Sequence, residues 1–388
     1  MQNASPILTP IRQANWDLSL AEFRSGATVL KSSPLVLIIE LTHNCNLSCP
    51  MCRAPLGYRS DWNLPNEIFL ELAERLFDKA MVIDLRGNGE STMRADFLWH
   101  IGLAVKSGAR LRLVTNGQIH REDVWDALMA SHSLVKISCD SSDEARFAHL
   151  RRGGQLERLK QSVRALARLR DHHGAPRDCV ALSVTVSRAN VGELSNIVKL
   201  AHELGVWKVT MHPIKTHRGD PLELLGAADT VELELLSAAK LAKELGVEIQ
   251  LNAALEPTLV LPDFVPDKCL HPWAYAFVNY QGRVGFCDHL TKNPKYTFES
   301  IREMPFERIW NCDAFQRLRQ AHLNRAIPAD FSPCRWCYKN RYIEFDDLLL
   351  PETKDRIVST KCNGLNGQLT PNHAKARDAL SSCACPTI

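Results

Sequence analysis

The chain has 388 residues, 45% of them hydrophobic, and a formal net charge of +3. This length and apolar content suffice for one large domain, or for a large domain with a small appendage. Basic and acidic residues are interspersed, which excludes the clustered basic surface of a nucleic-acid-binding protein. There is no signal-peptide pattern and no run of roughly 18 apolar residues, so we expect a cytoplasmic protein without membrane contact.

Residues 34–42 (PLVLIIELT) are a continuous run of β-branched residues and leucine, typical of a strand buried on both faces. Strand-like and helix-like segments then alternate. Strands are predicted at 34–42, 81–87, 110–117, 134–140, 180–187 and 206–213, and helices at 69–80, 96–108, 121–130, 155–171, 191–204 and 229–244. Parallel neighbouring strands need crossover helices, and a complete eightfold barrel usually takes about 250 residues, so the pattern predicts an α/β fold with a partial (β/α)6 barrel.

The alternation ends near residue 253, where prolines and a second group of cysteines appear. Short strands, turns and one helix over about 312–323 are predicted there. The last residues are rich in Ser, Asn, Thr and Gly without apolar periodicity, which predicts a flexible tail. We therefore predict an N-terminal extension at 1–33, the barrel at 34–252, a small α+β domain at 253–350 and a tail at 351–388.

Thirteen cysteines are unevenly distributed. In a reducing cytosol grouped thiols are more often metal ligands or catalytic groups than disulfides. Cys45, Cys49 and Cys52 follow the first strand at its carboxyl end, where barrel active sites are built. Three thiolates suit three corners of an iron–sulfur cubane and leave one iron open, whereas structural zinc takes four ligands. A second group of four thiols suits another cluster or one zinc.

The spacing C-x3-C-x2-C directly after the first strand resembles that of the radical S-adenosylmethionine (SAM) enzymes, over roughly residues 34–345. In this family the open iron binds the methionine part of SAM. Met51 stands where the family often has an aromatic residue, and methionine is an adaptable contact for a ring. The resemblance implies a SAM-binding 4Fe–4S cluster held by Cys45, Cys49 and Cys52.

Further motifs of the family follow at successive strand ends, in RGNGEST, TNG, SCDSSDEARFAHLRRGG and VSRAN. By resemblance, Gly89 lets the backbone approach the ligand closely, and Glu90 accepts a hydrogen bond from the methionine ammonium. Arg188 suits the SAM carboxylate because its donors form a planar fork, with a solvated surface arginine as the alternative. The residues that the resemblance assigns to SAM or to adjoining substrate are Asn88, Gly89, Glu90, Asn116, Ser138, Asp140, Ser187 and Arg188.

The second cysteine group resembles the C-terminal extension of the family in its shortened, or twitch, form of the SPASM domain. The additional cysteines of the full form are absent from CYKNRYIEFDD. The resemblance implies one auxiliary 4Fe–4S cluster, making two clusters in all. Its ligands are Cys269, Cys287, Cys334 and Cys337.

Within the family, the nearest resemblance is to the aminocyclitol dehydrogenases of the 2-deoxy-scyllo-inosamine type. It implies an oxidoreductase of antibiotic or natural-product biosynthesis that cleaves SAM to a 5′-deoxyadenosyl radical. That radical oxidises a secondary alcohol of a small sugar-like or aminocyclitol substrate to a ketone. The auxiliary cluster would accept the electron, and a flavodoxin- or ferredoxin-type protein would reduce the enzyme.

Three alternatives stay open. A peptide maturase forms thioether or carbon–carbon cross-links, but the short N-terminal extension and the smaller cysteine set argue against it. A radical epimerase or dehydratase is the second alternative, with Cys139 as an epimerase's hydrogen donor. A non-enzymatic iron–sulfur or zinc scaffold would need no SAM pocket. The sequence does not identify the catalytic base, for which the candidates are His149, Arg151, His212, His271 and Tyr275.

Overall fold

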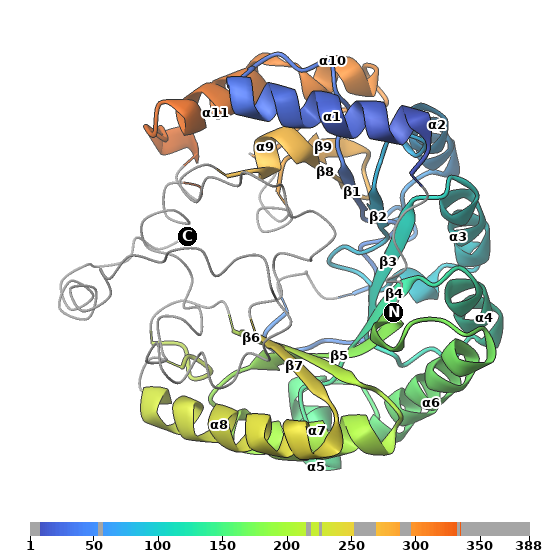
Figure 1. Ribbon diagram of the computed structural model, residues 1–388, viewed down its shortest axis with the longest axis vertical. Helices are drawn as coiled ribbons and strands as arrows, with labels where there is room; N and C mark the ends of the chain where they lie inside the picture. The colour runs from blue at the N-terminus through green and yellow to red at the C-terminus, as the bar shows by residue number, and fades with distance from the viewer. Residues whose placement is uncertain are drawn as a thin grey trace.

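The computed structural model describes residues 8–52, 57–214, 219–224, 227–251, 269–287, 296–331 and 334. In these residues ten strands form one curved sheet in the order β10-β9-β8-β1-β2-β3-β4-β5-β6-β7, and helices surround its outer face (Figure 1). The strands are β1 (Val36–Ile39), β2 (Val82–Asp84), β3 (Arg110–Thr115), β4 (Leu134–Ser138), β5 (Val180–Val186), β6 (Lys208–Pro213), β7 (Glu248–Leu251), β8 (Tyr275–Val278), β9 (Arg283–Gly285) and β10 (Thr297–Ser300). The α-helices are α1 (Pro10–Ser25), α2 (Asn66–Leu76), α3 (Phe97–Lys106), α4 (Glu122–Ala130), α5 (Glu144–Leu150), α6 (Leu156–His172), α7 (Leu194–Glu203), α8 (Ala228–Leu245), α9 (His271–Ala274), α10 (Phe306–Trp310) and α11 (Asp313–Leu323).

Strands β1 to β7 are parallel neighbours in chain order, which confirms the predicted α/β fold with an incomplete barrel. The six predicted strands correspond to β1–β6. A seventh parallel strand, β7, follows α8 and was not predicted. It is short and only Ile249 of its residues is buried, so it lacks the apolar run that marks the central strands.

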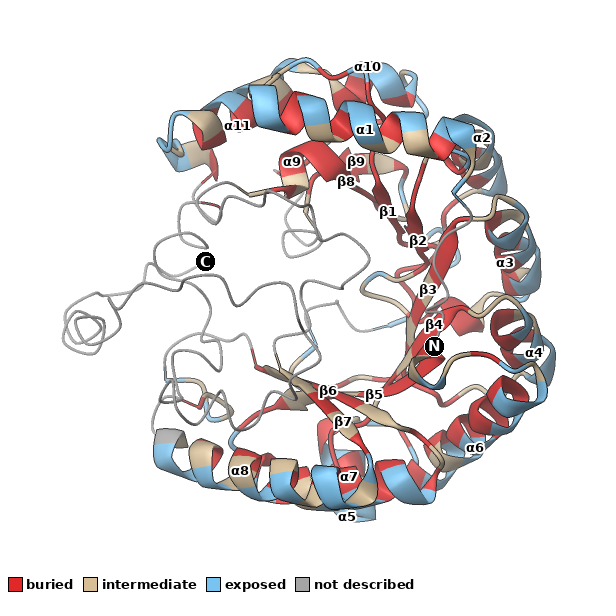
Figure 2. Cartoon of the chain, in the orientation of Figure 1, coloured by how far each residue is buried: buried red, intermediate tan, exposed pale blue. Residues whose placement is uncertain are grey.

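The two faces of the curved sheet differ in polarity. In β5, Leu182, Val184 and Val186 are fully buried, whereas Ser183 and Thr185 between them are partly exposed. Side chains alternate between the two faces of a strand, and the helices cover the outer face with their buried sides turned toward the strands (Figure 2). The polar positions therefore face the inside of the curve, where His212 of β6 lies opposite Thr185.

Helix α1 lies in the segment predicted as an N-terminal extension, where no helix was predicted. It has little apolar periodicity because four of its five buried residues, all except Phe23, are polar or charged. The guanidinium of Arg12 donates to the carbonyls of Phe77, Ala80 and Ser107 at 2.7–3.1 Å. Glu22 accepts from two backbone amides further along the chain. Polar contacts to carbonyls and amides hold this helix in place.

The C-terminal strands continue the same sheet. β8 pairs in parallel with β1, with Val36 opposite Tyr275 and Ile39 opposite Val278. β9 then pairs antiparallel with β8, and β10 antiparallel with β9. This extension was not predicted, because strands of three or four residues give too short a pattern to assign a partner.

An aromatic cluster fills the space between β9, β10 and α11. Phe298 lies 5.9 Å from Phe286, 5.0 Å from Phe315 and 6.4 Å from Phe331, measured between ring centroids. Arg319 is fully buried beside this cluster, with its guanidinium over the ring of Phe315. The C-terminal elements thus pack on an aromatic cluster that is continuous with the hydrophobic core of the barrel.

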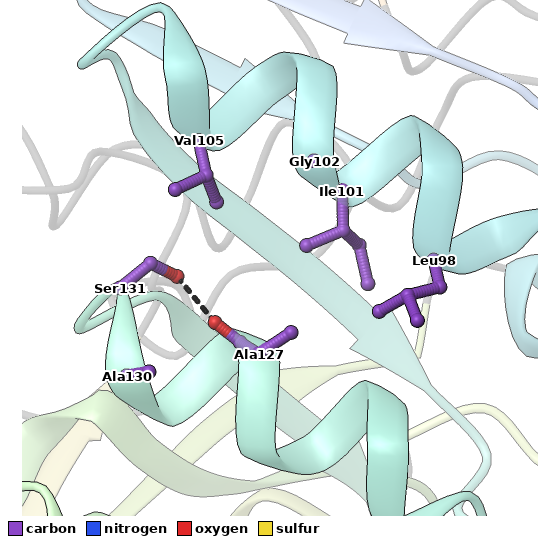
Figure 3. Close-up of a pocket in the computed structure, with 7 residues that line it drawn as sticks. All are labelled: Leu98, Ile101, Gly102, Val105, Ala127, Ala130 and Ser131. Atoms are coloured by element: carbon purple, nitrogen blue, oxygen red, sulfur yellow. Dashed lines mark hydrogen bonds between the residues drawn. The ribbon is translucent and has the colours of Figure 1, made fainter.

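On the outer face, α3 and α4 leave a shallow apolar groove between them (Figure 3). Leu98, Ile101 and Val105 line one side, and Ala127 and Ala130 the other. It contains none of the predicted site residues. Within the described residues, no helix combines the length and the apolar character that crossing a membrane requires.

Candidate functional site at the strand ends

The first cysteine loop begins where β1 ends. Cys45 is half-buried, Cys49 is buried and Cys52 is exposed. The backbone amide of Ser48 donates to the carbonyl of Arg152 at 2.9 Å, and that of Cys52 to the carbonyl of Cys49 at 2.9 Å. The loop is therefore closed on itself and attached to the segment that follows α5.

The surroundings of the sulfur atoms suit thiolate ligands. The backbone amide of Leu47 and the side-chain amide of Asn116 point at Sγ of Cys45, at 3.5 and 3.8 Å. Burial raises the pKa of the Cys45 thiol to about 11 and raises that of Cys49, so metal coordination is what would deprotonate them. Among the described residues no three His, Cys, Asp or Glu side chains converge as ligands of a single ion do. Thiol ligands with amide donors fit an iron–sulfur cluster, whose corners each take one thiolate.

The turn at 88–90 lies directly against the cysteine loop. A Cβ atom on Gly89 would lie 2.3 Å from the carbonyl oxygen of Thr42 and 2.6 Å from that of Asn44. The backbone amide of Glu90 donates to the same Asn44 carbonyl at 2.8 Å. Gly89 therefore permits a close approach to the backbone of the cysteine loop, and its predicted approach to SAM stays a prediction.

Glu90 is buried and its carboxylate is occupied by neighbours within the chain. Oε1 accepts from the hydroxyls of Thr92 and Thr115 at 2.7 and 2.8 Å, and Oε2 from the backbone amide of Asn116 at 2.7 Å. Burial raises the pKa of Glu90, and these hydrogen bonds oppose the shift. Its predicted contact with the methionine ammonium stays a prediction, while the observed contacts join the turn after β2 to the end of β3.

Asn116 connects the end of β3 to the cysteine loop. Its side-chain amide donates to Oδ1 of Asn46 at 2.8 Å as well as pointing at Cys45. Gly117, which follows it, has a φ of 68°, as expected for a turn after a strand. Asn116, which the resemblance assigns to SAM or to adjoining substrate, thus lies beside a predicted cluster ligand.

The buried Asp140 and the half-buried Arg151 form an ion pair beside Cys49. Nε of Arg151 lies 2.6 Å from Oδ2 of Asp140, while Oδ1 accepts from the backbone amide of Thr185 at 2.8 Å. Burial opposes the charge of Arg151, but Asp140 and Cys49 beside it raise the pKa of the guanidinium above its usual range. Ser138, also predicted, is half-buried at the end of β4.

The segment after β5 separates two residues that were predicted together. Ser187 is buried and hydrogen-bonded through its amide and hydroxyl to Oδ1 of Asn190, at 2.7 and 3.1 Å. Arg188 is exposed, and its Nε donates to the carbonyl of Glu223 at 3.2 Å. Asn190, which the sequence did not single out, reaches the carbonyl of Asp140 at 2.8 Å. Asn190 thus joins the segment after β5 to the end of β4, and no sequence motif marks a residue with this role.

The candidate bases do not form one constellation. His149 is exposed at the end of α5, whereas His212 lies on the inner face, 3.4 Å from the hydroxyl of Thr185. His271 and Tyr275 stack with a centroid distance of 4.3 Å, far along the chain and next to Cys269. Arg151, by contrast, lies beside Cys49 of the first cysteine loop.

The second cysteine group is carried by the C-terminal elements. Cys269 precedes α9 and Cys287 follows β9, both half-buried, and Cys334 is buried. Cys337 lies outside the described residues. Nδ1 of His271 lies 3.5 Å from Sγ of Cys269.

Sequence reasoning also missed Glu40. It is 1% exposed at the end of β1 and contacts three segments of the chain. A signal was present, since Glu40 is an acidic residue inside the apolar run at 34–42. A buried carboxylate in such a run must have hydrogen-bond donors around it.

The chain matches two protein families. The radical SAM superfamily matches residues 39–215, and the iron–sulfur cluster-binding SPASM domain matches residues 269–338. The chain is 28% identical over 319 residues to the PqqA peptide cyclase of Gluconobacter oxydans (strain 621H), covering 79% of this chain and 84% of the cyclase.

Two solved structures are similar in fold. Streptococcus suis SuiB bound to its precursor peptide SuiA has a TM-score of 0.58 at 15% identity, covering 87% of this chain and 77% of that one. The enzyme anSMEcpe with bound AdoMet has a TM-score of 0.59 at 16% identity, covering 84% of this chain and 96% of that one. The radical SAM and SPASM domains imply SAM and both a SAM-binding and an auxiliary 4Fe–4S cluster as cofactors.

The comparisons overturn the predicted reaction. The sequence relatives are peptide cyclases, so oxidation of a small sugar-like or aminocyclitol alcohol is wrong, and the resemblance to aminocyclitol dehydrogenases is not confirmed. The error has a physical reason. Cysteine spacing determines which cluster is bound, whereas substrate choice depends on side chains inside the barrel that follow no motif.

Proposed function

The chain carries a radical SAM domain and an iron–sulfur cluster-binding SPASM domain, and from this premise we propose that it modifies a peptide by closing a bond between two of its residues. The observation that carries the proposal is the 28% identity to a PqqA peptide cyclase, which extends over 84% of that enzyme. The similarity therefore includes both domains rather than the SAM-binding part alone.

In this proposal the two cysteine groups have separate tasks. Cys45, Cys49 and Cys52 hold the cluster that binds SAM, and the group from Cys269 to Cys337 holds the auxiliary cluster. SAM and the clusters together supply hydrogen-atom abstraction and an acceptor for the remaining electron. The turn at 88–90, with Asn116, Ser138, Asp140, Ser187 and Arg188, is proposed to orient SAM.

The inner face of the sheet is proposed to receive the peptide. Ser183, Thr185 and His212 lie there as polar, partly exposed side chains. Closing a bond between two residues removes two hydrogen atoms from the peptide. One leaves to the adenosyl group of SAM, and the other leaves as a proton and an electron. A side chain on this face, such as His212, is positioned to take the proton.

Two further partner assignments stay predictions. A flavodoxin- or ferredoxin-type protein is expected to supply the electron that starts the reaction. No nucleic-acid partner is expected, since the charges of the chain are balanced and interspersed.

The proposal is tested by anaerobic incubation of the reconstituted protein with SAM, dithionite and one peptide at a time. The probes are the PqqA peptide of Gluconobacter oxydans and the precursor peptide SuiA of Streptococcus suis. We expect 5′-deoxyadenosine together with a peptide product lighter by two hydrogen atoms, measured by mass spectrometry. The triple variant Cys45→Ala, Cys49→Ala, Cys52→Ala is the control and should give neither product.

The contrary result is equally clear. If wild-type protein forms 5′-deoxyadenosine at the same rate with and without these peptides, and no peptide loses mass, the peptide proposal fails. Radical SAM chemistry would stand in that case, because SAM cleavage itself was observed.

A further inference from the structure

Glu40 lies at the junction of three segments. It follows the last residue of β1 and is 1% exposed. Both oxygens of its carboxylate accept hydrogen bonds, and its partners come from the cysteine loop, the 88–90 turn and the hairpin between β8 and β9.

The first contact is with the turn predicted to bind SAM. Oε1 of Glu40 accepts from the backbone amide of Asn88 at 2.8 Å and from its side-chain amide at 3.2 Å. Gly87 packs against the same side chain, since a Cβ atom there would lie 2.3 Å from Cγ of Glu40. The Glu40 side chain thus holds this turn through hydrogen bonds to Asn88 and through close packing that only a glycine at position 87 permits.

The second contact is with the C-terminal hairpin. Oε2 of Glu40 accepts from the backbone amide of Tyr280 at 3.3 Å, and the amide of Glu40 donates to the carbonyl of Val278 at 2.8 Å. His43, whose Nδ1 lies 3.0 Å from Oε1, packs its ring on Tyr280 with a centroid distance of 4.9 Å. Residues of the two matched domains therefore share one buried carboxylate.

We infer that Glu40 is a positioning residue for SAM, which acts through Asn88 and fixes the SAM-binding turn relative to the hairpin of the SPASM domain. A hydrogen bond to a charged acceptor is stronger than one between neutral groups, so the carboxylate holds both amides more firmly than a neutral side chain would. This inference rests on the SAM-binding role proposed for residues 88–90, but not on the peptide substrate.

The substitution Glu40→Gln tests the inference with little change of shape. Glutamine has one acceptor oxygen and one amide donor, so it cannot accept from Asn88 and Tyr280 on separate oxygens. Its NH₂ group must turn toward one of two N–H donors, and one of the two contacts is lost. SAM affinity should then fall although both cysteine groups are intact.

Glu22 supplies the matched control. It is also buried, at 8% exposure, and its two oxygens accept from the backbone amides of Lys31 and Ser32 at 2.6 and 3.2 Å. Glu22→Gln therefore causes the same chemical change at a site that contacts neither cysteine group in the described chain. Any general cost of neutralising a buried glutamate should appear in both variants.

The measurement is the dissociation constant of SAM by equilibrium dialysis against the reconstituted protein, with iron content and unfolding temperature determined on the same samples. We expect Glu40→Gln to weaken SAM binding about 10-fold, a loss of one charge-assisted contact. Its iron content should equal that of wild type, and Glu22→Gln should bind SAM within about twofold of wild type.

The inference is overturned if Glu40→Gln binds SAM within about twofold of wild type, or if Glu22→Gln weakens binding equally. If Glu40→Gln does not accumulate as folded protein, the variant Gly87→Ala takes its place, and the same twofold limit on SAM binding applies. The Cβ of the alanine displaces the Glu40 side chain without removing its charge. Wild-type protein that binds no SAM would instead contradict the assignment of SAM itself.

Discussion

The two cysteine groups are held in place by different kinds of contact. Around Cys45 and Cys49 the neighbours are polar groups, among them Glu90, Asn116 and Arg151, joined by hydrogen bonds and an ion pair. Around the second group the described neighbours are short strands and helices that pack on an aromatic cluster. A loop at strand ends depends on individual polar atoms, whereas a packed unit depends on its core, so single substitutions should affect the two regions differently.

The largest effect is expected from removing the first group of thiols. The triple variant Cys45→Ala, Cys49→Ala, Cys52→Ala should lose dithionite-driven formation of 5′-deoxyadenosine. Its iron content should fall from about eight to about four per chain, because only one of two cubanes is lost. Iron and sulfide analysis after anaerobic reconstitution measures this.

The reciprocal variant Cys269→Ala, Cys287→Ala is the control for that experiment. It should keep SAM cleavage without substrate while its iron content falls to about four. If both variants lose all iron, the two regions are not separate and the comparison fails.

A single polar change in the first region comes next. Glu90→Leu leaves the amide of Asn116 and the hydroxyls of Thr92 and Thr115 without their acceptor. We expect a loss of about 4 kcal/mol in the free energy of unfolding, since each buried group left without a partner costs about 1–3 kcal/mol. Urea denaturation measures it, with Glu157→Leu, an exposed glutamate of α6, as the control.

The corresponding change in the second region is Arg319→Leu. Its guanidinium donates to the carbonyls of Thr28, Pro272 and Trp310 at 2.8 Å in each case. Burial lowers the pKa of Arg319 to about 9, yet the group is protonated at neutral pH. We expect a loss of about 3 kcal/mol because three carbonyls lose a charged donor.

Arg319→Leu also distinguishes the two cysteine groups. Arg319→Leu should reduce auxiliary iron and leave SAM cleavage in place, as judged by iron content and 5′-deoxyadenosine formation. Arg317→Leu, whose side chain is 66% exposed on the same helix, is the matched control. Equal loss of iron from both cysteine groups would show that the contacts of Arg319 stabilise the whole molecule.

The smallest effect is a pH dependence of stability that belongs to neither cysteine group. His100 of α3 is fully buried with Nδ1 donating to the carbonyl of Asp96, and burial together with Arg94 lowers its pKa to about 4. The unfolded chain, with a histidine pKa of about 6.5, binds the proton more readily, so acidification below pH 6.5 favours unfolding. At pH 5 the loss should be about 2 kcal/mol.

The substitution His100→Asn removes this titration and keeps a donor near the position of Nδ1. Urea denaturation of the variant should therefore depend less on pH between 5 and 7 than that of wild type. His120→Asn, at an exposed position, should behave as wild type. An unchanged pH dependence in His100→Asn would contradict the assignment.

The sequence predicts the barrel well where apolar runs and helices alternate, as in β1–β6 with α2–α4 and α6–α8. It does not predict α1, whose buried face consists largely of Arg12, Asn15, Ser19 and Glu22. A helix whose buried face is polar shows no repeat of apolar residues in the sequence, so it is recognised only from its contacts in the structure. Strands β8–β10 are too short for their pairing with β1 to follow from local pattern.

At the candidate site, the residue types and their strand ends are predictable, but their orientations are not. The resemblance assigns Glu90 and Arg188 to SAM, but it does not indicate that Glu90 is enclosed by Thr92, Thr115 and Asn116 or that Arg188 is exposed. Orientation depends on neighbours distant in sequence, such as Asn190 or Glu40. The substrate was predicted wrongly because the cysteines specify electron chemistry and carry no information about the molecule being modified.

The pairing of β8 with β1 has a consequence for how the protein can be divided. Sequence matches separate the chain into two domains, but the hydrogen bonds of one sheet run through both. A fragment ending after β7 would expose the apolar strand Val36–Ile39 as a bare edge, and such edges template aggregation. The N-terminal domain is therefore expected to be insoluble when expressed alone. Gene fusions and truncations should keep β1 and β8 paired.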